Sequence, residues 1–114
     1  MIADEIKKTW LKSYDDEVRP NLDYEKIPIY EYLDRSAQKY PQRPAIIFNN
    51  WKINYAKLKK LAERVAANLR AHGLKPGNRV AIMLPNTPQC IISYWGVLKA
   101  GGVVVMTNPL YMEK

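Results

Sequence analysis

The stretch RVAIMLPNTPQCIISYWGVLKAGGVVVM, residues 79–106, decides the fold of this 114-residue chain. It contains an uninterrupted apolar run at 80–84 and a second one at 103–106. Runs without polar alternation are typical of strands buried on both faces of a parallel sheet. Between them, residues 89–100 are apolar nearly all round and end at a glycine pair, which predicts a buried helix with Thr87-Pro88 as its N-cap and first residue. The order predicts a right-handed βαβ unit with parallel strands.

Two further helices are predicted upstream of this unit. Apolar residues at three- and four-residue steps mark residues 29–40 and 55–72 as helices. Asn54 stands at the N-cap position of the longer helix, and Gly73 follows it as the C′ residue. Between the helices, short apolar runs on either side of Asn49-Asn50 predict a β-hairpin, because asparagine tolerates the positive φ of a tight turn.

The chain divides into two parts by composition. Residues 1–27 form an acidic leader, or arm, with a short helix predicted over 3–13. Trp10 and Tyr14 give this leader a small apolar cluster of the kind that docks on a partner or on the chain's own domain. The fold class is α/β, and residues 28–114 are expected to be the first part of a larger domain.

The parallel strand pair predicts an incomplete sheet. Two strands and one helix cannot cover both faces of a parallel sheet, which is buried on each side in stable folds. In this sequence, residues 107–114 follow the second predicted strand. We therefore expect a truncated piece of a larger α/β protein, inactive by itself and prone to self-association through exposed apolar surface.

Composition excludes several classes of protein. One cysteine cannot form an internal disulfide, and one histidine with scattered acids does not make a zinc site of the usual kind. The N-terminus lacks the apolar core of a signal peptide. Lys99 and Gly101-Gly102 interrupt the longest apolar stretch, so no segment is expected to span a bilayer. The expected location is the cytoplasm, with peripheral contact to a membrane left open.

The net charge of +7 is unevenly distributed. Residues 1–34 carry 9 acids and 5 bases, a balance of −4, whereas residues 35–114 carry 2 acids and 13 bases, a balance of +11. Such asymmetry is typical of nucleic-acid or membrane surfaces, and it also arises when a protein is divided. A small basic nucleic-acid-binding module is therefore kept as an alternative, although the apolar runs predict a buried sheet and no groove-reading helix.

No residue stands out as catalytic, cofactor-binding or metal-ligating. The phosphate-binding patterns GxxxxGK[ST] and GxGxxG are absent. His72 ends a basic helix, where it can interact with the last carbonyls, and Cys90 has apolar neighbours, which favours core packing over a reactive thiol. Gly101-Gly102 predicts a tight turn between helix and strand. The acids at 15–17 and the bases of 55–72 are interpreted as solvated, against the alternatives of a cation site and of phosphate contacts.

A set of short motifs follows in a recognisable order from residue 28 to 111. They are PAI at 44–46, NYAKL at 54–58, GLKPGNRVAI at 73–82, LPN at 84–86, GVLKAGGVVV at 96–105 and NPLY at 108–111. In this order and spacing the chain resembles the N-terminal region of the adenylate-forming acyl-CoA synthetases, the AMP-binding ligase family. The NPLY ending and the leader with Trp10 and Tyr14 are most similar to the long-chain fatty acid–CoA ligase branch. Asn54, Asn78 and Met112 depart from the family's usual Thr, Asp and Thr without affecting the expected fold.

The resemblance implies a two-step ligase. The carboxylate of a fatty acid attacks the α-phosphorus of ATP, which is bound with Mg²⁺, to give an acyl-adenylate and pyrophosphate. The thiol of coenzyme A then displaces AMP to give a thioester. The family's phosphate loop, its Tyr-Gly-x-Thr-Glu segment, its ribose-binding Asp and its C-terminal-domain Lys do not occur in this sequence, so the resemblance implies scaffold roles only.

The resemblance also bears on partners. In some fatty-acid members the leader takes part in dimer contacts, which makes Trp10 and Tyr14 interface candidates for a homodimer. An aryl-CoA ligase and the adenylation domain of a peptide synthetase stay open as alternatives, and the length of the acyl chain is undecided.

Overall fold

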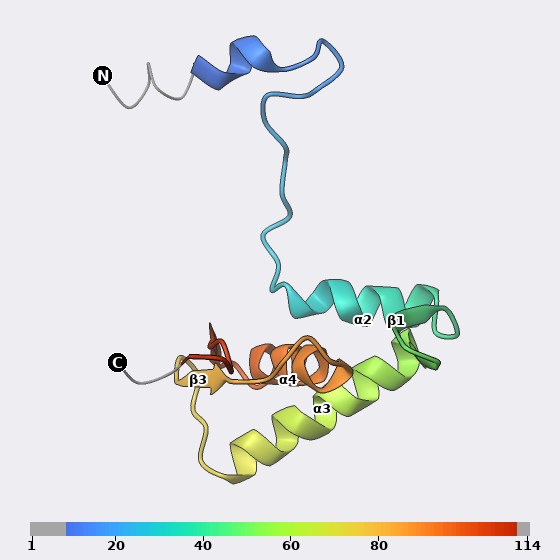
Figure 1. The fold of residues 1–114 in the computed structure, drawn as a ribbon, viewed down its shortest axis with the longest axis vertical. Helices are drawn as coiled ribbons and strands as arrows, with labels where there is room; N and C mark the ends of the chain where they lie inside the picture. The colour runs from blue at the N-terminus through green and yellow to red at the C-terminus, as the bar shows by residue number, and fades with distance from the viewer. Residues whose placement is uncertain (1–8, 112–114) are drawn as a thin grey trace.

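The computed structural model describes residues 9–111. The elements in this part of the chain are, in order, η1 (Trp10–Ser13), α2 (Tyr30–Lys39), β1 (Pro44–Phe48), β2 (Trp51–Asn54), α3 (Tyr55–Ala71), β3 (Arg79–Ile82), α4 (Pro88–Lys99) and β4 (Val103–Met106) (Figure 1). The expected α/β architecture is confirmed, with a hairpin, a long helix and a parallel βαβ unit. The helix predicted over 3–13 falls partly on residues 1–8, outside the described residues, and its described end is the 3-10 turn η1.

The parallel strand pair forms as predicted. β3 and β4 pair in register from Arg79 opposite Val103 to Ile82 opposite Met106. β3 ends two residues before the apolar run does, so Met83 and Leu84 belong to the loop that leads into α4. Among residues 9–111, one face of the pair is covered, because α4 packs against Ile82 while the outward face is exposed. This matches the expectation that two strands and one helix leave a sheet face open.

The core lies where α4 crosses α3. One cluster of buried side chains joins the hairpin, α2 and α3, and a second joins β3 and α4. Ala62 of α3 is fully buried, and Gly96 of α4 faces it so closely that a Cβ atom at Gly96 would lie 2.5 Å from Val65 Cγ1. Small residues on both helices therefore permit an approach that larger side chains would prevent.

Local signals set the ends of α3. The Asn54 side chain accepts a hydrogen bond from the Lys57 amide at 2.8 Å, as its N-cap position predicts. At the other end Gly73 has φ +97°, and the Leu74 amide donates to the Leu69 carbonyl at 3.0 Å. This is the Schellman arrangement, in which a residue with positive φ lets amides beyond the helix satisfy its last carbonyls.

The cap of α4 differs from the prediction. Thr87 occupies the N-cap position, but its hydroxyl donates to the Pro85 carbonyl at 3.2 Å and does not cap the helix. The hydroxyl instead closes the turn that follows β3. The Thr87 carbonyl begins the helix by accepting from the Cys90 amide at 3.1 Å.

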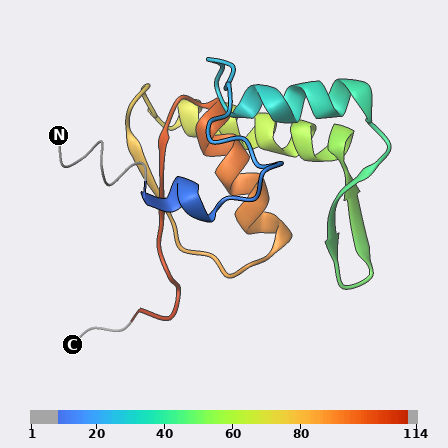
Figure 2. The same cartoon turned by 90° about the horizontal axis from the view of Figure 1, so that it is seen from above.

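The hairpin and the arm extend from opposite parts of the helical body. The hairpin turns at Asn49, whose φ of 52° confirms the predicted turn, and it stands away from the helices on the side opposite β3 (Figure 2). Residues 14–28 form no helix or strand and rise away from the start of α2 (Figure 1). The radius of gyration, 18.4 Å, exceeds the roughly 13 Å of a compact domain of this size because of this arm. Glu25 ties the arm to α2 through Arg35 at 2.7 Å.

The close approach of α3 and α4 predicts a specific sensitivity at Gly96. Replacing Gly96→Ala places a Cβ against Val65 and should lower the free energy of unfolding by about 1–3 kcal/mol, despite the better helix propensity of alanine. Chemical denaturation followed by circular dichroism measures this. Ser93→Ala on the same helix serves as the control and should change stability by less than about 0.5 kcal/mol. Equal stability of the two variants would contradict the packing described above.

Candidate functional site

The residues singled out in the sequence do not come together in space. His72 lies at the C-terminal end of α3, with Nδ1 2.8 Å from the Asn68 carbonyl oxygen, which agrees with the helix-end interpretation. Cys90 is buried beside Ile82 and Val97 and packs as a core residue. Gly101, with φ +85°, makes the turn between α4 and β4.

The described part of the acidic arm, residues 9–27, contains no group of side chains that could hold a metal ion. The acids at 15–17 are exposed, as expected of a solvated run. In the part of the chain that the structure describes, no three His, Cys, Asp or Glu side chains are placed to hold a metal ion. Trp10 and Tyr14 are also exposed and contribute to no buried cluster of the described residues. Among residues 9–111, no helix is both long enough and apolar enough to cross a membrane.

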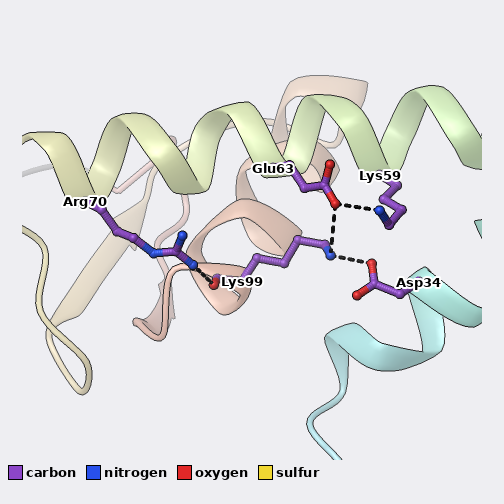
Figure 3. Close-up of polar contacts among 5 residues, drawn as sticks. All are labelled: Asp34, Lys59, Glu63, Arg70 and Lys99. Atoms are coloured by element: carbon purple, nitrogen blue, oxygen red, sulfur yellow. Dashed lines mark hydrogen bonds and ion pairs between the residues drawn. The ribbon is translucent and has the colours of Figure 1, made fainter.

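A polar network joins α2, α3 and α4 (Figure 3). Its centre is Lys99, whose side chain is only 8% exposed. The Lys99 ammonium donates to the Asp34 carboxylate of α2 and lies 4.0 Å from Glu63 Oε1 of α3. Lys59 donates to the same Glu63 oxygen at 2.6 Å, and this hydrogen bond raises the pKa of the Lys59 ammonium. Two carboxylates thus meet two ammonium groups, so the network is electrically balanced.

Both the backbone and the side chain of Lys99 make contacts with other helices. The Arg70 guanidinium donates to the Lys99 carbonyl, one of the C-terminal carbonyls of α4 that lack a partner within the helix (Figure 3). The ring of Tyr30 lies 5.5 Å from the Lys99 ammonium. Lys99 therefore fixes the end of α4, and with it the start of β4, against two helices that come earlier in the chain.

This network is not predicted from the sequence, although a signal for it is present. Lys99 is the single charged residue in the apolar run from 90 to 106, and a cation at such a position needs a carboxylate partner if its helix is buried. The identity of that partner, 65 residues away, is visible only in the folded chain.

A crevice lies at the carboxyl ends of the two parallel strands. A hollow of about 570 Å³ is lined by residues 84–86, which come after β3, and by residues 106–111, which are the last residue of β4 and the loop beyond it. The Thr107 amide extends the ladder by donating to the Ile82 carbonyl at 3.0 Å. Asn108 Oδ1 accepts from the Leu110 amide at 2.9 Å and so shapes the second loop. This edge of a parallel sheet is where open α/β folds bind ligands.

Comparison with known proteins gives the family. The sequence pattern described as AMP-binding enzyme matches residues 33–114. The chain belongs to the AMP-binding enzyme family. It is 43% identical over 107 residues to the long-chain-fatty-acid–CoA ligase of Bacillus subtilis (strain 168). The aligned part is 94% of this chain and 19% of that protein. The corresponding ligase of Yersinia pestis is 37% identical over 111 residues, covering 96% and 20%.

Solved structures of AMP-binding relatives have the same fold. The N-terminal subdomain of NpsA from Klebsiella oxytoca matches with a TM-score of 0.72 and 31% identity over 75% of this chain and 23% of that one. A Mycobacterium tuberculosis fatty acyl CoA synthetase matches with a TM-score of 0.69 and 30% identity over 74% and 17%. This AMP-binding chain spans about a fifth of the length of the curated relatives it matches.

Because of this network, we expect Lys99 to contribute more to the stability of this AMP-binding chain than the exposed Lys60 does. Lys99→Met leaves Asp34 without its buried partner and should lower the free energy of unfolding by about 2 kcal/mol, a figure reduced because Asp34 is partly exposed. Chemical denaturation measures the change. Lys60→Met, at an exposed position on α3, is the control and should cost less than about 0.5 kcal/mol.

A double variant separates charge from packing in this experiment. Adding Asp34→Leu to Lys99→Met removes the stranded carboxylate and should recover part of the lost stability. If the single and double variants are equally unstable, the loss comes from packing of the lysine stem and the network is not its cause.

Proposed function

We propose that this chain is scaffold in an ATP-dependent fatty acid–CoA ligase. The whole protein would activate a long-chain carboxylate as an acyl-adenylate, release pyrophosphate, and transfer the acyl group to the thiol of coenzyme A. The observation that carries the proposal is the 43% identity, over nearly the whole chain, to a long-chain-fatty-acid–CoA ligase. The fold supports it, because a fatty acyl CoA synthetase of known structure contains the same arrangement.

The division of the chain belongs to the same proposal. Residues 1–27 are the leader, and residues 28–114 are the first part of the large N-terminal domain. The family pattern begins at residue 33, within α2, and the body of the structure begins with that same helix. The exposed outer face of the β3–β4 pair supports this division, because further elements of a larger domain would cover it.

ATP, Mg²⁺ and coenzyme A are proposed for the whole protein. The described residues hold no cluster of three metal-ligating side chains, and the crevice at residues 84–86 and 106–111 has no charged side chain for a phosphate. We therefore assign no step of the reaction to a residue of this chain. The cytoplasm, which supplies ATP and coenzyme A, is the proposed location, with contact to membranes where long-chain acids partition.

An aryl-acid adenylating enzyme is the second candidate. The NpsA subdomain, of similar fold, has been solved with 3-hydroxyanthranilyl-AMSN. The higher sequence identity and wider coverage of the fatty-acid ligases favour a fatty acid. The family assignment does not favour the basic nucleic-acid-binding module that the charge distribution left open.

A chimaeric enzyme tests the proposed function. Residues 1–114 of this chain replace the matching residues of the Bacillus subtilis ligase, and formation of palmitoyl-CoA is measured. We expect the chimaera to retain at least a tenth of the parent activity, because the replaced part supplies framework and no reacting group. The matched control is the same ligase with these residues deleted, which should be inactive. A chimaera that folds but forms no palmitoyl-CoA would contradict the proposal.

Self-association of the isolated chain is proposed from its exposed apolar surface. Val105 lies on the open sheet face, Trp51 on the hairpin, and Trp10 and Tyr14 on the arm. Such side chains favour association into a homodimer or larger assembly.

Sedimentation velocity tests the association, and two variants locate it. Val105→Lys should shift the chain toward monomer if the sheet face is responsible, whereas the pair Trp10→Ser and Tyr14→Ser should do so if the leader is responsible. A wild-type chain that sediments as a monomer and binds no hydrophobic dye would contradict this proposal.

A further inference from the structure

The hairpin tip, residues 47–51, carries an exposed apolar cluster that belongs to neither buried cluster of the body. Ile47 is 66% exposed, Trp51 is 67% exposed and Phe48 is 38% exposed. The base of the same hairpin is buried in the core cluster that joins it to α2 and α3. The hairpin is therefore held by its base and projects its tip into solvent, away from the helices (Figure 2).

Apolar side chains lie on both faces of the hairpin tip. Ile47 pairs with Lys52, and Phe48 pairs with Trp51. Because successive residues of a strand point to opposite faces, Ile47 is on one face of the ribbon and the two aromatic residues are on the other. A hollow of about 450 Å³ lies between the aromatic face and the first turn of α4. The aromatic face is thus as accessible to a partner as the Ile47 face is.

Apolar groups on two faces favour a fluid partner over a flat one. The surface of a folded protein, a second copy of this chain included, covers one face of a two-stranded ribbon and leaves the other face in water. The outer layer of a lipid bilayer surrounds an inserted tip on every side. Tryptophan suits this layer, because its ring is apolar and its N–H group can stay hydrated. The carboxamides of Asn49 and Asn50 at the turn are compatible with the headgroup region, where water is present.

The charges around the hairpin favour an anionic membrane. Residues 35–62, which contain the hairpin, hold seven Lys or Arg and no Asp or Glu. Lys52 lies on the same face as Ile47, and Lys57 lies in the first turn of α3, which follows β2 directly. Neither lysine forms an ion pair with any residue of the described part of the chain. A lysine close to an anionic bilayer strengthens binding by roughly fivefold.

We propose that the hairpin tip inserts into the headgroup region of an anionic lipid bilayer and anchors the protein there. Ile47, Phe48 and Trp51 enter the interface, and the ammonium group of Lys52 contacts lipid phosphates. The proposal supplies a surface for the membrane contact proposed above, and it holds whichever acid the ligase activates. Nucleic acid and a second copy of the chain are the competing partners.

Sedimentation of the 114-residue chain with sucrose-loaded vesicles tests the proposal. Vesicles of phosphatidylcholine with about 30% phosphatidylglycerol should bind the chain at least roughly tenfold more strongly than phosphatidylcholine alone. Raising the NaCl concentration from about 0.05 to about 0.5 M should weaken that binding at least roughly fivefold, because salt screens exposed charges. The chimaeric ligase that carries residues 1–114 should bind the same vesicles within about threefold of the isolated chain, because its hairpin stays exposed.

A matched pair of variants separates the hairpin tip from other exposed apolar residues. Ile47→Asn combined with Trp51→Asn should weaken vesicle binding at least roughly tenfold, because the variant loses apolar area that enters the interface. The control removes one tryptophan and one β-branched residue from the arm. Trp10→Asn combined with Val18→Asn, at positions that are 46% and 49% exposed, should leave binding within about twofold. Circular dichroism shows whether both variants keep the fold.

Fluorescence quenching locates Trp51 in the bilayer without disturbing the hairpin. Lipids brominated on the acyl chain near the headgroup should quench the tryptophan fluorescence of the bound chain. Trp51→Phe keeps an aromatic ring at the tip, so it should bind within about threefold of the original chain and lose most of the quenching. Lys52→Gln should weaken binding to the anionic vesicles about fivefold, whereas Lys75→Gln, also at an exposed position, should weaken it less than about twofold.

Several results would overturn the inference. They are equal vesicle binding by the tip and arm variants, binding that does not depend on lipid charge, quenching that persists in Trp51→Phe, tighter binding to duplex DNA than to vesicles, and a tip variant that converts a self-associated chain into a monomer without lipid. A chimaera that makes palmitoyl-CoA but binds no vesicles would leave the proposed function in place and exclude the membrane anchor.

Discussion

The contact between α3 and α4 is the constraint on which the rest of the structure depends. Because Gly96 has no side chain, Val65 and the backbone of Ala62 can occupy the space that a Cβ atom would fill, and the two helices lie close together. Because α4 also covers the inner face of the β3–β4 pair, the position of α3 fixes where that pair lies relative to the hairpin and α2. Dense packing of this kind tolerates little change in side-chain volume, so a shift of α3 would move α4 and the strand pair with it.

A small network of charged side chains joins α2, α3 and α4 beside this contact. Lys99 is nearly buried at the end of α4, and its ammonium is balanced by carboxylates from α2 and α3. A buried ion pair adds little net stability compared with apolar packing, but a partner left alone is costly, so the pair restricts how the three helices can be arranged. The hydrogen bond from the Arg70 guanidinium to the Lys99 carbonyl adds a second restriction at the same residue. These contacts hold the end of α4 against α2 and α3.

The open surfaces are consistent with a chain that works as part of an AMP-binding enzyme. The outward face of the strand pair is exposed and largely apolar, and residues at its carboxyl edge line an open, uncharged crevice. Their common feature is apolarity, which suits them to pack against other elements of a large domain.

The sequence by itself determined the local elements and the family. Apolar periodicity gave the helices, and Asn54 and Gly73 gave the ends of α3, because caps act through neighbouring backbone groups. Only the tertiary structure decided that Lys99 pairs with Asp34, that the Thr87 hydroxyl turns back to Pro85, and that residues after β3 and at the end of β4 line one crevice. The physical reason is the separation of the interacting residues along the chain. Periodicity and capping depend on residues a few positions apart, whereas a partner 65 residues away is selected by how the helices pack.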